Sequence, residues 1–67
     1  MSANEPQYVI VHSRTGKFAY GYEPRRKRWF WTINSELARK FGTEQKAWYY
    51  VVTHGDHPKA RVILYHN

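Results

Sequence analysis

Residues 23 to 33 read EPRRKRWFWTI, and within this stretch four consecutive cations run directly into aromatic residues. After the cations, the alternation of side chains predicts a strand over residues 29 to 33. One face of this strand carries Trp29, Trp31 and Ile33, and the other carries Phe30 and Thr32. We expect the tryptophan face to be packed and Phe30 to lie outside.

Other runs of strand length lie on both sides of this segment. Residues 8 to 12 are rich in β-branched side chains, and a turn cluster that ends in Gly16 follows them. Residues 17 to 22 alternate, so every second side chain falls on one face. The aromatic residues of that face are Phe18, Tyr20 and Tyr22. Residues 60 to 65 are the last candidate strand.

Helix signals occupy the region between the third and fourth candidate strands. Asn34 or Ser35 can cap a short helical turn, which we expect to run through Leu37, Ala38 and Phe41 to a break at Gly42. Thr43 then caps a longer helix over residues 44 to 53, and Gly55 ends it.

The longer helix has two distinct faces on a helical wheel. The predicted core face consists of Ala47, Tyr50, Val51 and His54. The opposite face consists of Gln45, Lys46, Tyr49 and Thr53. Tyr49 and Lys46 are therefore expected to face solvent.

The predicted order is β-β-β-α-β, an α+β fold in which one main helix covers one face of a small antiparallel meander. A helix is needed because one layer of strands cannot bury an apolar face alone. Residues 1 to 6 are expected to form a disordered N-terminal tail, and residues 7 to 66 a single domain. At 67 residues, folding buries only about 60% of the surface of the unfolded chain, so stability should be modest.

Charge favours an acidic partner. Eleven Lys and Arg against five Asp and Glu give a formal charge of +6. Nucleic acid, an anionic membrane and an acidic protein surface all fit this charge. We expect no membrane partner, because the sequence has no basic amphipathic helix and no lipidation motif. No signal peptide or apolar span is recognisable and Cys is absent, so we expect a cytoplasmic protein and a monomer.

Catalytic and metal-binding signals are weak. The five acids form no recognisable pair for acid–base chemistry, so we expect no enzyme and no cofactor. His54, Asp56 and His57 superficially resemble metal ligands, but their spacing spans a helix end and a turn, and no Cys supports them. Gly16 and Gly21 have the spacing of phosphate-loop glycines without the Lys-Ser/Thr that follows them in such loops.

The residues expected to bind a partner combine point charges with rigid apolar surface. They are Arg25, Arg26, Lys27, Arg28, Phe30, Tyr22, Lys46 and Tyr49. A plain solvated loop between strands is the alternative for the cationic run.

The layout Gly16-Lys17-Phe18, then Trp31-Thr32, then Ala38-Arg39-Lys40-Phe41-Gly42-Thr43-Glu44 with Ala47 resembles that of small phage-encoded and prophage-encoded proteins. Some of these look similar to host-takeover regulators that bind bacterial RNA polymerase. The resemblance implies a small non-enzymatic regulator in the host cytoplasm that binds the transcription machinery and inhibits or modulates transcription. The alternative is a direct DNA- or RNA-binding module, with cations on phosphates and aromatic rings stacked on bases.

Overall fold

The computed structural model describes residues 6–65, which form a four-stranded antiparallel sheet with one α-helix packed on it. The elements in chain order are β1 (Gln7–His12), β2 (Phe18–Glu23), β3 (Arg28–Thr32), the 3₁₀ turn η1 (Ser35–Leu37), α1 (Glu44–Thr53) and β4 (Ala60–Tyr65). The predicted α+β class and the order β-β-β-α-β are confirmed. None of the helices in this part of the chain has the length and apolar character that crossing a bilayer requires.

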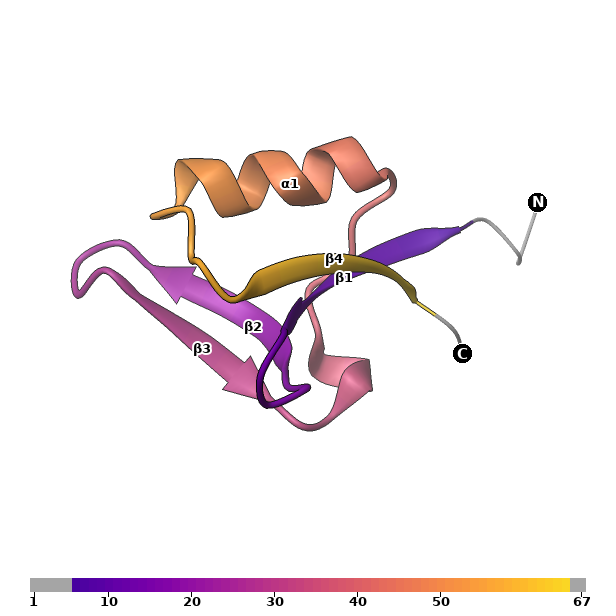
Figure 1. The fold of residues 1–67 in the computed structure, drawn as a ribbon, viewed down its shortest axis with the longest axis horizontal. Coiled ribbons are helices and arrows are strands. Elements are labelled where there is room, and N and C mark those ends of the chain that lie inside the picture. Colours follow the sequence, from indigo (N-terminus) through magenta and orange to yellow (C-terminus); the bar gives the residue numbers. More distant parts are fainter. Residues whose placement is uncertain (1–5, 66–67) are drawn as a thin grey trace.

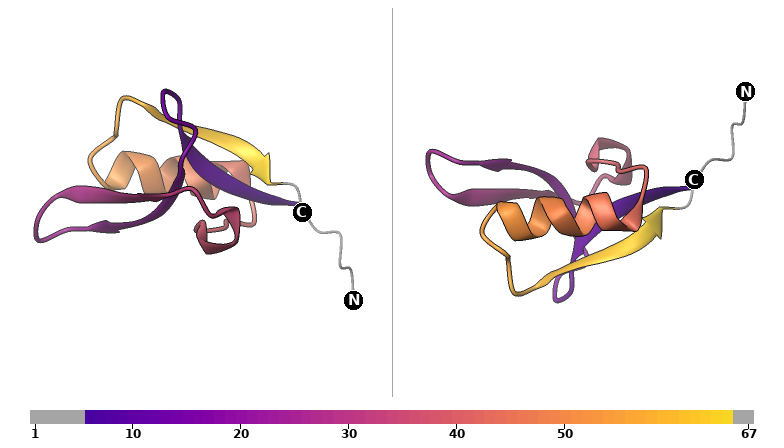
Figure 2. Two further views of the ribbon diagram at one scale, coloured as in Figure 1. Left: turned by 90° about the horizontal axis from the view of Figure 1, so that it is seen from below. Right: turned by 90° about the horizontal axis from the view of Figure 1, so that it is seen from above.

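The strand order in the sheet is β3-β2-β1-β4. β4 pairs with β1 along its whole length, from Gln7↔Tyr65 to His12↔Ala60. β2 pairs with β3 along its length but meets β1 in register only at Val11↔Phe18. The hairpin of β2 and β3 therefore diverges from β1, and its tip extends beyond the end of α1 (Figures 1 and 2).

Divergence of β2 leaves room beside the first half of β1, and the segment before α1 fills it. Phe41 exchanges two backbone hydrogen bonds of 2.8 Å with Tyr8, and the Arg39 N–H donates to the Ala19 carbonyl. Our expectation that the short helical turn runs through Ala38 and Phe41 is therefore wrong, because η1 ends at Leu37 and Phe41 pairs as an isolated β-bridge.

The helix begins and ends as its sequence predicts. The Thr43 hydroxyl accepts a hydrogen bond from the Lys46 N–H at 3.1 Å, which satisfies one of the free donors of the first turn. After Thr53 the chain turns through Gly55, whose φ of 95° suits glycine. The predicted helix phase is also confirmed, since Ala47 and Val51 are buried and Tyr49 is 71% exposed.

The core under α1 is small. Its fully buried members are Ile10, Ala19, Ala47, Val51 and Ala60. Partly buried aromatic rings surround them, including Trp29, Trp31, Phe41 and Tyr50. The tryptophan face of β3 is therefore the packed one, and Phe30, 38% exposed, lies outside as expected.

A β-bulge in β2 changes the predicted side-chain phase. The register steps from Ala19↔Trp31 to Gly21↔Phe30, so Tyr20 is an extra residue without a partner of its own. Tyr22 consequently shares the packed face with Trp29, while Tyr20 is 54% exposed. Our placement of Phe18, Tyr20 and Tyr22 on one face is wrong for this reason.

Ile33 also departs from its predicted face. β3 ends at Thr32, and Ile33 is 82% exposed in the bend that follows. The Thr32 hydroxyl accepts a hydrogen bond from the Asn34 N–H at 3.0 Å, which turns the chain away from the sheet before Ile33 can continue the alternation.

Candidate functional site

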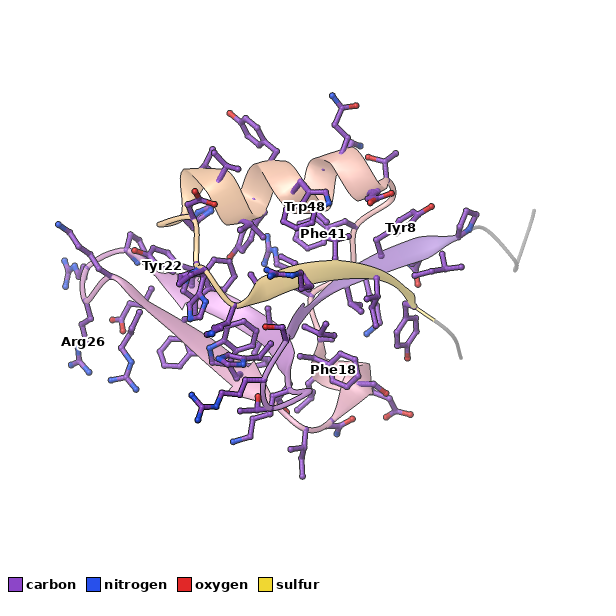
Figure 3. All side chains as sticks on the ribbon, viewed as in Figure 1. Tyr8, Phe18, Tyr22, Arg26, Phe41 and Trp48 are labelled. Atoms are coloured by element: carbon purple, nitrogen blue, oxygen red, sulfur yellow. The ribbon has the colours of Figure 1, made fainter. Side chains whose placement is uncertain are left out.

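The four consecutive cations lie at the tip of the β2–β3 hairpin. Pro24 to Lys27 form the turn, Arg28 opens β3, and the side chains from Arg25 to Arg28 are all exposed. Figure 3 places Arg26 at the free end of the molecule, away from α1. The one ion pair among residues 6–65 joins Arg26 Nε to Glu23 Oε2 at 3.9 Å, which is long and exposed. The tip therefore presents largely unneutralised positive charge.

Lys27 has an uncommon backbone conformation. Its φ is 53°, in the left-handed region that glycine adopts freely and that costs other residues about 1–2 kcal/mol. Hairpin turns commonly place Gly or Asn at such a position. A lysine there keeps a cation at the tip at some cost in stability.

The cations continue into an aromatic surface on β3. Arg28 pairs with Glu23, and Phe30 pairs with Gly21, on the side of the hairpin that faces away from α1. The Arg28 guanidinium carbon lies 5.2 Å from the centroid of the Phe30 ring, a cation–π contact. We call Tyr20, Gly21, Arg28 and Phe30 the outer face of the hairpin.

Tyr22 belongs to the opposite side of the hairpin. Its ring lies 5.5 Å from Trp29 and 5.1 Å from His54, edge to face in both cases. Figure 3 shows Tyr22 on the side of the strands nearer to α1. The structure therefore separates Tyr22 from Phe30, although the sequence grouped them in one candidate binding surface.

Lys46 and Tyr49 form a second surface, on the solvent side of α1. Both are exposed, and together with Thr43 and Gln45 they line a shallow open depression. Trp48 and Val52 are 37% and 60% exposed on the same helix. This surface lies on α1, away from the basic tip of the hairpin (Figure 1).

A cluster of aromatic rings and histidines between the hairpin and the α1–β4 connection was not predicted. Trp29 stacks on Trp31 with centroids 5.6 Å apart and planes inclined by 21°. His12 and His57 approach the Trp31 ring edge to face, at 5.0 Å and 5.3 Å. The sequence gives no local signal for this cluster, because its members come from β1, β3 and the loop before β4.

A backbone hydrogen bond defines the tautomer of the neutral His57 ring within that cluster. Its Nδ1 accepts a hydrogen bond from the Lys59 N–H at 3.0 Å, so the proton of the neutral ring is on Nε2. Burial of the ring lowers the pKa of His57 below its ordinary value of 6.5, and the positive charges of His12 and Lys59 lower it further.

No group of three or more metal-binding side chains comes together within residues 6–65. His54 Nδ1 donates to the Tyr50 carbonyl at 2.8 Å, whereas the His57 ring packs against His12 and Trp31. The two histidines that resemble a ligand pair in sequence thus have separate structural partners.

Two residues of the outer face were missed by sequence reasoning, Tyr20 and Gly21. A glycine inside an alternating strand is a known mark of a bulge or of a close approach by a ligand, so Gly21 was the available signal.

Comparisons of this chain with protein-family models, with curated proteins and with solved structures found no match.

Proposed function

We propose that this chain is a small non-enzymatic module that binds nucleic acid through the tip and the outer face of the β2–β3 hairpin. The observation that carries the proposal is the continuity of the exposed cations with exposed aromatic rings. Arg28 lies against Phe30, and Arg25, Arg26 and Lys27 follow at the turn. Cations neutralise phosphates and exposed rings stack on bases, so both halves of a nucleotide find a partner on one surface.

Strain at Lys27 also supports this function. Sparsely populated backbone conformations persist where the surrounding structure enforces them, and they are common at binding sites. A lysine with a φ of 53° serves the fold less well than glycine would, but it adds an exposed cation at the tip of the hairpin.

The test replaces Arg25, Arg26, Lys27 and Arg28 together by Ser, which leaves a net charge of +2 from the original +6. We expect the wild-type protein to bind labelled oligonucleotides at low salt, with a log–log salt slope of about −0.7 to −0.9 for each phosphate contacted. The quadruple variant should stay folded and lose most of that binding, measured by fluorescence anisotropy across a salt series.

A charge-matched control separates local from overall charge. Arg14, Lys17, Lys46 and Lys59 are all exposed and lie outside the hairpin tip, and their replacement by Ser also leaves +2. This control should retain most of the affinity of the wild type. Equal loss of affinity in both variants would show that the net charge of the protein, and not the hairpin tip, determines binding. If the wild-type protein binds no oligonucleotide probe at low salt, nucleic-acid binding is refuted.

The second candidate is a regulator that binds the host transcription machinery, as the resemblance to phage proteins implies. The exposed apolar surface of α1 favours it, because Trp48, Tyr49 and Val52 offer a protein partner the side-chain types that anchor interfaces. A nuclease-treated pull-down from bacterial lysate tests this candidate. Stoichiometric recovery of RNA polymerase, lost on Tyr49→Ala, would support it, and absence of the polymerase would refute it.

A further inference from the structure

The bulge at Tyr20 brings the side chains of Tyr20 and Phe30 and the glycine Gly21 together on the outer face of the hairpin. Ala19 is buried under α1, so the strand alternation turns Tyr20 to the opposite face. In a bulge two residues oppose one, and here Tyr20 is the extra residue, between Ala19, which pairs with Trp31, and Gly21, which pairs with Phe30. Two exposed aromatic side chains thus adjoin a position that has no side chain.

Gly21 is not required by the fold at this position. An ideal Cβ placed on Gly21 would meet no atom within 4 Å, and the φ of Gly21 is not in the left-handed region. A glycine inside a strand weakens the strand, because it has no side chain to pack and loses more chain entropy on folding. Gly21 itself is half-buried, and it leaves its backbone without a side chain beside its cross-strand partner Phe30. We call this bare position the Gly21 notch.

Positive charge adjoins the notch on one side. Arg28 lies two residues before Phe30 on β3, and its guanidinium is already held over the Phe30 ring at 5.2 Å. The remaining cations of the tip continue from Arg28 around the turn. A ligand that carries planar rings and anionic groups along one chain fits this arrangement. Its rings would contact Phe30 and Tyr20, and its anionic groups would contact Arg28 and the cations of the tip.

We infer that the outer face of the hairpin binds single-stranded nucleic acid, with a base seated over the Gly21 notch against Phe30 and Tyr20, and phosphates on Arg28 and the tip. This inference rests on the proposed nucleic-acid function and names its substrate class. A duplex keeps its base faces stacked inside, so it can offer the hairpin phosphates but no free base to stack. Single strands should therefore bind more tightly than duplexes of the same length.

The decisive variant is Gly21→Val, which fills the notch without removing any charge or ring. Valine suits a strand and meets an open space at its Cβ, so the fold should be kept. We expect affinity for single-stranded oligonucleotides to fall by about fivefold or more, the loss of one stacked base, while duplex affinity and the salt slope stay the same. Gly42→Val is the matched control, because Gly42 also has open space around its Cβ and precedes α1, outside the hairpin.

The readout is fluorescence anisotropy with labelled single-stranded and duplex probes for wild type and both variants, with circular dichroism to verify folding. Unchanged single-strand affinity in a folded Gly21→Val protein would refute binding of a base at the Gly21 notch. Nucleic-acid binding by the tip would remain possible in that case. Equal losses for single strands and duplexes would refute binding of a base at the notch as well, since filling the notch would then disturb phosphate contacts. If the wild-type protein binds neither probe at low salt, the proposed function fails along with the inference.

Discussion

At the scale of the residue, a substitution of Lys27 is expected to affect the stability of the hairpin and its positive charge in opposite directions. The left-handed conformation of Lys27, φ 53°, disfavours any side chain that carries a Cβ. Lys27→Gly should therefore raise the free energy of unfolding by about 0.5–1 kcal/mol, after allowance for the greater freedom of glycine in the unfolded chain. Chemical denaturation measures this change.

The same substitution removes one cation from the proposed binding site. Lys27→Gly should weaken oligonucleotide binding and reduce the magnitude of the salt slope by about 0.7, one phosphate contact. A stabler protein that binds less tightly would link the strain at Lys27 to function. A less stable one would mean that the lysine side chain supports the turn.

Tyr49 and Val51 provide a residue-scale test of the helix. Tyr49 is 71% exposed and Val51 is 1% exposed, although the two lie only two positions apart on α1. Tyr49→Ala should change the free energy of unfolding by less than about 0.5 kcal/mol, whereas Val51→Ala should lower it by about 2–3 kcal/mol by opening the core. Equal destabilisation in urea denaturation would contradict the observed packing of α1.

At the scale of the element, the connection from α1 to β4 holds a pH-sensitive contact. His57 in this connection packs against Trp31 and His12, and its Nδ1 accepts the Lys59 N–H. Protonation at Nδ1 would replace that acceptor with a donor and place a second positive charge beside Lys59. The neutral ring is therefore the form that stabilises the connection.

The lowered pKa of His57 fixes the sign of the pH dependence. Below pH 6.5 the unfolded chain takes up the proton before the folded chain does, so the free energy of unfolding falls as the pH drops from 6.5 towards the folded-state pKa. Above pH 6.5 the contribution of His57 is complete and constant.

The variant His57→Gln cannot titrate, so its stability should depend less on pH in that window than the stability of the wild type does. Thermal denaturation of both proteins at a series of pH values measures the difference. Parallel profiles for the two proteins would show that His57 does not carry the effect.

The pair β1–β4 and the hairpin β2–β3 have different places in the sheet. β1 and β4 form the body of the sheet under α1, with β4 paired along all of β1. β2 and β3 pair mainly with each other and diverge from β1, so the hairpin they form can change its tip without disturbing the core. This separation is the structural reason why substitutions at the tip are expected to alter binding and spare folding.

At the scale of the whole molecule, the structure distributes the candidate surfaces over different sides. The basic tip and the outer face of the hairpin belong to one surface, and the exposed side of α1 belongs to another (Figures 1 and 2). A nucleic acid on the hairpin would leave Tyr49 accessible, so the two candidate functions can be separated by substitutions that act on only one surface.

Local features of the sequence determined the elements of this protein and their order. Thr43 caps α1, Gly55 follows its end, and residues 60 to 65 form β4, all as the sequence predicts. Each of these signals acts between residues that are close in sequence. A side chain satisfies a nearby backbone group, or the spacing of apolar residues places them on one face of a helix or strand. The exposed tip and the packed tryptophan face followed from the same local patterns.

Only the tertiary structure decided the features that depend on how distant segments pair. The bulge at Tyr20 depends on the register between β2 and β3, the bridge of Phe41 to Tyr8 depends on the divergence of β2 from β1, and the contact of His12 with His57 joins β1 to the loop before β4. A register shift of one residue reverses the face of every later side chain in a strand, and no periodicity within that strand reveals where the shift occurs. Tyr22 therefore lies inside and the Gly21 notch outside for a reason that the sequence of β2 does not contain.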